Sequence, residues 1–476
     1  MAVAYETQVD IPLFSGLDTS GDGYNKAMRL AREMENVNVT GGRFAPMREG
    51  RKILQALEKP IGTLAVLNRR YGFTDSERNL LVAVSDGKLW TKLLDGDDAW
   101  IVRYTGLSTD NCDFVSYEIN EEGNDPIDVL LLSNATDGMI CLYGDDLHVV
   151  TVQTPYKFGV IARFNERIWG TAIDEKPDSL VYSKPYNPFD WDADEDIPED
   201  GGGEIMQPSW DGDRFLALCQ YGSQLLAFKK NSIWRVLGTD PGEFIIREQY
   251  GHGAVQENTI CTYNDVVWLL GYGGIMRYDG SLTLPFKPEE TSGILRERFS
   301  EGAWDKATAV IRDRTYCLAV ALDGSETNNA VLEYNCAEGS FSLRTGISVK
   351  AFTRAENRVF YTSDTEPGCI YEMVEDGHAL PVKWVSAYQD LGLKSSVKSG
   401  FMVYFVAEAE TPFDLVLGIR TEKKLKEKRI QVKPGKPNRI QLNVSGRYFR
   451  LELSSTTLVP YEIKGGFRIY MELDPD

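Results

Sequence analysis

The chain has 476 residues, of which 42% are hydrophobic and 26% charged, and its formal net charge at pH 7 is −20. These proportions exclude an intrinsically disordered chain, and so acidic a body would repel the phosphates of nucleic acid. Frequent aromatic residues, glycines and prolines favour strands and turns, so we expect an all-β fold. The start lacks the pattern of a signal peptide, and the longest apolar stretch, residues 266–276, is too short to span a bilayer, so no membrane segment is expected.

Residues 1–60 are predicted to form an extended arm that contains one short helix. Met28, Ala31, Met34 and Val37 follow one another at regular short intervals after a segment rich in glycine and aspartate. Such spacing places apolar side chains on one face of a helix. We therefore expect an amphipathic helix in this part of the arm.

Residues 61–380 repeat one pattern: a short apolar run, a turn with glycine or asparagine, and a second run rich in tryptophan, tyrosine and isoleucine. The runs are too short for ordinary helices, and the turns are typical of β-hairpins. Repeats of roughly 40–50 residues predict a β-propeller of about six or seven blades, with five blades or a pair of β-sandwiches as structural alternatives. The repeats include residues 79–93, 128–144, 160–173, 215–238, 259–280, 309–335 and 349–373.

Four tryptophans recur at similar places in these repeats, and we expect them to pack between blades: Trp90, Trp169, Trp234 and Trp268. The seven cysteines are scattered without a CxxC pair, which predicts free thiols in a reducing compartment and no zinc site.

Signals for catalysis are weak. The three histidines lie far apart in the sequence, no nucleophile elbow of the G-x-S-x-G type occurs, and the glycine-rich residues 271–280 are predicted to form a hairpin rather than a nucleotide loop. We therefore expect no enzymatic activity, no cofactor and no metal site. Two carboxylates that meet across the propeller mouth for glycoside hydrolysis are the weaker enzymatic alternative.

An acidic run lies between the third and fourth repeats, at residues 190–204. Asp192, Asp194 and Asp196 alternate as in a calcium loop, but Ile197 and Gly203 stand where an EF-hand requires glycine and glutamate. We expect an exposed acidic loop whose candidate interaction residues are Asp192, Asp194, Glu195 and Asp196.

Residues 381–476 alternate strictly between apolar and polar side chains, which predicts a separate C-terminal β-sandwich. This part holds 16 basic and 11 acidic side chains, whereas the residues before it hold 35 and 60. Residues 420–439 are predicted to form a basic hairpin, whose lysines either guard a sheet edge or dock onto an acidic neighbour such as a second copy of the chain. Charge reversal at Lys423, Lys424 and Lys426 is expected to weaken assembly. The candidate interaction residues are Lys423, Lys424, Lys426, Lys428 and Arg429.

Three stretches of the chain resemble structural proteins of tailed bacteriophages. Residues 14–52 are similar to an opening with a G-L-(N/D) start, an N-V pair, and a G-x-(F/L)…R-x-G element, here Gly42, Phe44, Arg48 and Gly50. The family's R-P-G reads M-R-E-G at residues 47–50, which is a departure. Residues 164–191 and 225–238 resemble its R-(I/L)-W and its L-L-x-F strand elements. The resemblance is to podophage tail hub or nozzle proteins, including the packaged-DNA stabilisation class of head-to-tail accessory factors.

The resemblance implies a propeller-bearing virion protein of the tail, assembled in the host cytoplasm. It implies a homo-oligomeric ring, usually hexameric, that lies below the portal and adaptor, contacts other tail proteins and closes the DNA channel. Genomic DNA would pass without sequence-specific binding, because an acidic ring offers its phosphates no counter-charge. The runner-up is a receptor- or carbohydrate-binding module of the tail, with Tyr186, Phe189 and Trp191 as the sugar platform.

Overall fold

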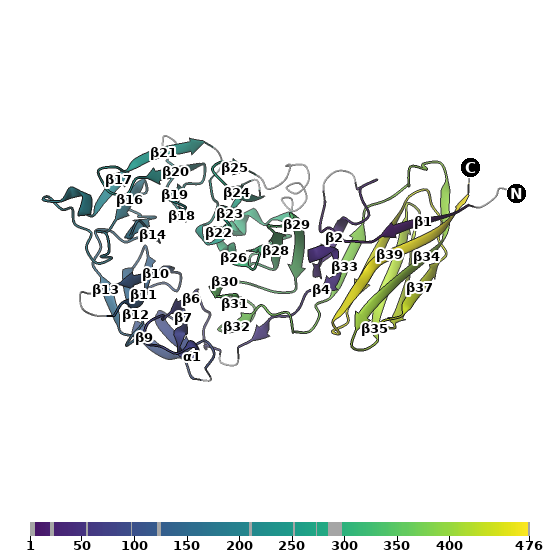
Figure 1. Ribbon diagram of the computed structural model, residues 1–476, viewed down its shortest axis with the longest axis horizontal. Coiled ribbons are helices and arrows are strands. Elements are labelled where there is room, and N and C mark those ends of the chain that lie inside the picture. Colours follow the sequence, from purple (N-terminus) through teal and green to yellow (C-terminus); the bar gives the residue numbers. More distant parts are fainter. Residues whose placement is uncertain are drawn as a thin grey trace.

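The computed structural model describes residues 5–19, 23–53, 56–96, 98–120, 125–208, 212–250, 253–272, 274–283 and 298–474. Figure 1 shows two units side by side: a ring of small sheets and a flattened pair of sheets, with both chain ends on the second unit. The protein is a β-propeller joined to a β-sandwich, as the sequence predicts.

Within the described residues the propeller has seven blades, each a four-stranded antiparallel sheet. Short polar turns join strands with buried apolar residues, and these side chains form clusters between neighbouring blades. Blades 1 to 3 contain β6 (Thr63–Asn68), β7 (Asn79–Ser85), β8 (Lys88–Leu93) and β9 (Ile101–Thr105); β10 (Asp113–Ile119), β11 (Ile127–Asn134), β12 (Gly138–Tyr143) and β13 (Val149–Val152); and β14 (Val160–Phe164), β15 (Arg167–Thr171), β16 (Ser179–Tyr182) and β17 (Gly203–Met206).

Blades 4 to 6 follow the same order: β18 (Ala217–Tyr221), β19 (Gln224–Phe228), β20 (Ser232–Leu237) and β21 (Ile245–Tyr250); β22 (Cys261–Tyr263), β23 (Val266–Gly271), β24 (Gly274–Tyr278) and β25 (Leu282–Thr283); and β26 (Thr308–Arg312), β27 (Thr315–Val320), β28 (Ala330–Asn335) and β29 (Ser340–Thr345). The helices described are one short turn, α1 (Asp75–Arg78), and the 3-10 turns η1 (Thr40–Gly42), η2 (Pro198–Asp200), η3 (Glu257–Thr259) and η4 (Glu301–Lys306). None of the helices described is long and apolar enough to cross a membrane.

The seventh blade is completed by the N-terminal segment. Its strands are β30 (Ala351–Ala355), β31 (Arg358–Thr362), β32 (Ile370–Glu372) and, on the outside, β5 (Arg51–Lys52). The Arg51 guanidinium donates to the Glu372 carboxylate at 2.6 Å, and Arg358 Nε donates to the same group at 2.7 Å. The start of the chain therefore closes the propeller against its last blade.

The sandwich also takes strands from both ends of the chain. One sheet has the order β1 (Tyr5–Ile11), β39 (Tyr461–Asp474), β34 (Val397–Ala409), β37 (Pro437–Leu442). The other has the order β2 (Ala31–Glu35), β33 (Val382–Ser386), β38 (Phe449–Ser455), β35 (Phe413–Thr421), β36 (Leu425–Val432). A small hairpin, β3 (Val37–Asn38) with β4 (Ala45–Pro46), follows β2. Residues 1–60, predicted as an arm, thus contribute strands to both units.

The predicted helix around residues 28–37 is wrong, because this segment forms strand β2. Met28, Ala31, Met34 and Val37 are all buried, so the spacing was informative about burial. The register of β2 against β33 shifts between Ala31 and Glu33. Such a bulge inserts an extra residue, so Ala31 and Met34 both point to the core although their spacing in a regular strand would put them on opposite faces.

The tryptophans confirm the predicted packing between blades but occupy two positions. Trp169 and Trp268 are buried on second strands, whereas Trp90 and Trp234 are half-buried on third strands. All four pack against hydrophobic clusters of the propeller.

The junction between the units is a continuous packed core. Buried aromatic rings of blades 5 and 6 share one hydrophobic cluster with the core of the sandwich. Asn36, between β2 and β3, has a left-handed φ of 58° and donates its backbone N–H to Leu343 O at 2.7 Å. Its Oδ1 accepts from Thr345 N at 2.8 Å, and its Nδ2 donates to Pro381 O at 2.8 Å. One buried asparagine therefore joins β29 of the propeller to the chain that enters β33.

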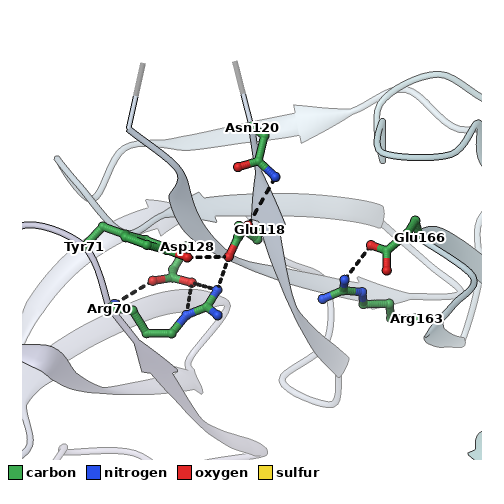
Figure 2. A network of polar contacts seen from close by, with 7 residues as sticks. All are labelled: Arg70, Tyr71, Glu118, Asn120, Asp128, Arg163 and Glu166. Atoms are coloured by element: carbon green, nitrogen blue, oxygen red, sulfur yellow. Dashed lines mark hydrogen bonds and ion pairs between the residues drawn. The ribbon is translucent and has the colours of Figure 1, made fainter. Parts of the chain in front are cut away.

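Polar contacts link adjacent blades at their loops. Figure 2 shows Arg70, in the loop after β6, donating from Nε to Asp128 Oδ1 at 2.8 Å. The same guanidinium reaches Glu118 at 2.6 Å, and the Tyr71 hydroxyl donates to Glu118 at 2.9 Å. Because Asp128 and Glu118 belong to blade 2, this network joins it to blade 1.

Candidate functional site

The acidic run lies in the loop between β16 and β17 of blade 3, where Asp192, Glu195 and Asp196 are exposed and Asp194 is half-buried. Its base is fixed by Arg167, a β15 residue with only 1% exposure. The Arg167 guanidinium donates to the carbonyl oxygens of Ser183 at 2.8 Å, Gly201 at 2.7 Å and Glu199 at 2.5 Å. A buried arginine on the strand thus fixes the shape of the loop that displays the carboxylates.

Within the loop, Asp194 is part of the local fold. Its Oδ1 accepts the backbone N–H groups of Asp196 at 3.1 Å and Ile197 at 3.0 Å. These bonds, together with Lys184, lower the pKa of Asp194. Asp192, Glu195 and Asp196 form no ion pair with the basic side chains described, so their charge is available to a partner.

The proposed sugar platform is not assembled. Tyr186 is 69% exposed, but Trp191 is 8% exposed, and its Nε1 donates to Pro188 O at 3.0 Å. Phe189 is half-buried and packs against the hydrophobic cluster between blades 2 and 3. Trp191 and Phe189 therefore pack within the fold, and Tyr186 is exposed by itself. The three side chains form no shared exposed surface.

The basic residues lie where the sequence predicts a hairpin, on the turn after β35 and along β36. In the described chain β36 pairs with β35 alone, so it is an edge strand of its sheet. None of the five candidate residues forms an ion pair with an acidic side chain that the structure describes. Lys423, Lys424, Lys426, Lys428 and Arg429 are all exposed.

The register shows which way these side chains point. Lys426 lies opposite Ile419 and Lys428 opposite Leu417, and both partners are buried in the sandwich core. Directly opposed residues share a face, so both lysines stand on the core side of the sheet at its open margin. Inward-pointing charges at an edge prevent uncontrolled strand pairing, yet they leave room for a partner that supplies carboxylates.

The structure does not bring the two candidate surfaces together within one chain. The acidic loop is on blade 3, and Figure 1 places this blade at the end of the molecule far from the sandwich that carries β36. Neither surface holds a constellation for bond-making chemistry. Each presents exposed side chains of one charge.

No protein-family model matches the sequence, and no curated protein is similar to it. The extracellular domain of a one-component system from B. thetaiotaomicron is similar in structure, with 10% identity and a TM-score of 0.46 over 87% of this chain. The chain spans 58% of that domain's length.

Two further structures are similar at the same level. The Pan2 WD40 domain of Neurospora crassa has 10% identity and a TM-score of 0.38 over 67% of this chain and 91% of its own. BBS1N, solved in complex with ARL6DN, has 13% identity and a TM-score of 0.41 over 70% and 98%.

Sequence reasoning missed a cavity on the propeller axis. Its lining residues include Asp113, the first residue of β10, and Glu257, which begins the 3-10 turn η3 before β22. The first strands of the blades meet around the axis, so an acidic residue near the start of a repeat could have been assigned to the cavity. The chain has many acidic residues, and this position alone did not distinguish Asp113 and Glu257 from the others.

Proposed function

We propose that the protein is a structural component of a tailed phage virion: a tail nozzle or hub subunit that forms a ring and extends the DNA channel below the portal and adaptor. In this proposal the exposed basic edge of one subunit, residues 423–429, contacts the acidic loop of its neighbour, residues 192–196. The observation that carries it is the placement of unpaired, opposite charges at opposite ends of one molecule.

The placement of charge favours rings over pairs. When two different surfaces of one chain bind each other, the contact is heterologous and repeats from subunit to subunit, closing a ring if the rotation per step allows it. A two-fold dimer would instead bring the same surface of both copies together. The continuous core between propeller and sandwich supports this geometry, because a rigid subunit keeps a constant angle between its two surfaces.

The residues that carry the phage resemblance have structural roles in this fold. The junction between propeller and sandwich contains Asn36 and Phe44, and the N-terminal segment that completes blade 7 contains Gly50. Arg167 supports the acidic loop. At Gly50 an added Cβ would lie 2.5 Å from Tyr361 Oη, so glycine is required where the N-terminal segment crosses blade 7. Motifs of this kind maintain an architecture, and the proposal takes that architecture to be the tail ring.

The test is the mass and shape of the purified protein by native mass spectrometry and particle imaging. We expect a closed ring of about six copies, as the phage resemblance implies, with an open centre. Reversal of Lys423, Lys424 and Lys426 to glutamate should shift it to monomers. Combining that variant with Asp192→Lys, Glu195→Lys and Asp196→Lys should restore rings, because the pairing of charge is then inverted.

The matched control is Lys394→Glu with Lys59→Glu and Lys230→Glu, which makes the same charge change at exposed positions outside residues 420–439. This control should keep the ring. Monomers in the unmodified protein at high concentration and low salt, or unchanged rings in the first triple variant, would contradict the proposed interface. A monomer or trimer that binds glycans would favour the receptor-binding alternative.

A further inference from the structure

A cavity of about 430 Å³ lies at one mouth of the propeller axis. Blades 1, 2, 3, 5, 6 and 7 all line it, mostly through the residues that precede or begin their innermost strands. Part of the wall is apolar, including Leu64, Phe114 and Phe352. This size and this mixture of surfaces are typical of small-molecule sites.

Two carboxylates in this wall differ in the hydrogen bonds that they accept. Asp113 accepts backbone N–H groups from Ile161 at 2.8 Å and Phe114 at 2.9 Å, so it helps to join blades 2 and 3. The Glu257 carboxylate receives no hydrogen bond and no ion pair from the residues described. Burial, together with the nearby charge of Asp113, raises the pKa of Glu257 to about 8.

A second, independent feature is an unused acceptor in the same wall. Asn328 is 1% exposed, and its Nδ2 donates to Lys306 O at 2.6 Å and Val349 O at 2.8 Å. These two bonds fix the orientation of the amide, and Oδ1 is left without a partner in the described structure. A buried carbonyl oxygen without a donor is unfavourable, so a ligand that donates to it gains affinity.

The charges around the cavity favour a cation with more than one charge. Asp305 and Asp364 also line it, from blades 6 and 7, together with the two lysines Lys306 and Lys350. Lys306 Nζ already donates to Glu326 O at 2.6 Å, so Lys350 and the nearby Arg214, which lowers the pKa of Glu257, are the charges that oppose a cation there. The carboxylates are spread over several blades, and in the described chain the single cluster tight enough for a metal ion is Asp145, Asp146 and His148, outside this cavity.

We propose that this axial cavity binds a linear organic polyamine, with one protonated amine on Glu257 and another donor on Asn328 Oδ1. The volume exceeds what a bare metal ion needs, because it equals about fourteen water molecules at roughly 30 Å³ each. Spread carboxylates match ammonium groups that are separated by short alkyl chains. The apolar wall suits the methylene segments between those groups.

The test is isothermal titration of the purified protein with spermidine near neutral pH. We expect saturable binding at one site per chain, and Glu257→Gln should weaken it about tenfold or more, because a charge-assisted contact is lost. Affinity of the unmodified protein should rise between about pH 6.5 and 8.5, since the amine competes with the proton on Glu257. Lys350→Met should strengthen binding by removing the opposing charge.

The control is Glu356→Gln, which removes an exposed carboxylate in the turn between β30 and β31 and should leave the affinity unchanged. Equal loss in both variants would mean diffuse attraction to an acidic protein and would overturn the site, as would unchanged binding in Glu257→Gln. Triethylene glycol, an uncharged chain of similar length, should not bind. If calcium chloride binds in a Glu257-dependent way and spermidine does not, the polyamine assignment is wrong.

Discussion

Buried ion pairs between side chains of neighbouring strands stabilise the sixth blade. Glu333, 6% exposed, accepts from Arg344 Nε at 2.7 Å and from Arg312 at 3.3 Å. Burial alone would raise the pKa of Glu333, but the two arginines outweigh it and lower that pKa. Arg344 also donates to Arg48 O at 2.7 Å, so the pair reaches the N-terminal segment.

Glu333→Gln should lower the free energy of unfolding by about 3–5 kcal/mol, because it leaves buried guanidinium charge uncompensated. The stabilisation is present above the ordinary glutamate pKa and is lost as pH falls through the lowered folded-state value. Chemical denaturation of both proteins at neutral pH measures the difference. Glu366→Gln, which breaks an exposed pair with Lys52, is the control and should change stability far less, because water screens that pair. Equal effects of the two changes would refute this account.

The raised pKa of Glu257 predicts that its contribution to the free energy of unfolding has the opposite dependence on pH. Its folded-state pKa of about 8 lies above the ordinary value of 4.5, so between these values the folded protein binds more protons than the unfolded chain. The free energy of unfolding should therefore fall as pH rises through this window. Thermal midpoints of the unmodified protein and Glu257→Gln, measured from pH 5 to 9, should diverge as pH rises, with the variant the more stable at high pH. Parallel curves would show that Glu257 titrates normally.

At the scale of elements, the sequence predicts the strands that recur in every blade. It does not predict structural features that occur only once in the chain. Short apolar runs with hairpin turns recur in every blade, so the strand content and propeller were predictable. Strand β5 has two residues and no hydrophobic pattern, and it is defined only by its partner β32. The bulge in β2 has no signature of its own, which is why its spacing indicated a helix.

The candidate site was predictable to a similar degree. Runs of like charge identified the acidic loop and the basic hairpin as exposed segments. The axial cavity gave no such signal, because Asp113, Glu257 and Asn328 are separated along the chain and meet only when the blades close into a ring.

Asn36→Ala tests the junction between elements. The change leaves Thr345 N and Pro381 O without their partners and places alanine at a left-handed φ, so we expect a loss of about 2–4 kcal/mol. Asn264→Ala, at φ 54° in an exposed hairpin turn, isolates the backbone effect and should cost about 1 kcal/mol. Thermal unfolding measures both, and limited proteolysis between the propeller and sandwich should accelerate in the first variant alone. Similar losses in both would assign the whole effect to backbone conformation.

For the whole molecule, charge and connectivity support one arrangement. The acidic propeller and the more basic sandwich are held by one core, so the molecule is electrically polarised along its length. In salt the attraction between charges falls steeply with distance, so the opposite ends of one chain hardly interact, whereas the touching surfaces of neighbouring chains do. The proposed ring should therefore loosen as salt concentration rises.

Closure by the first residues of the chain has a consequence for synthesis. Arg51 pairs with Glu372, 321 residues later in the sequence. The partners of β1 and β2 in the sandwich are separated from them by even more residues. A nascent chain therefore carries unpaired strands until nearly all of it has left the ribosome, and folding dominated by such distant contacts is slow. A product terminated before β32 can close neither unit. Completeness of translation is thus a condition for the protein to acquire its shape.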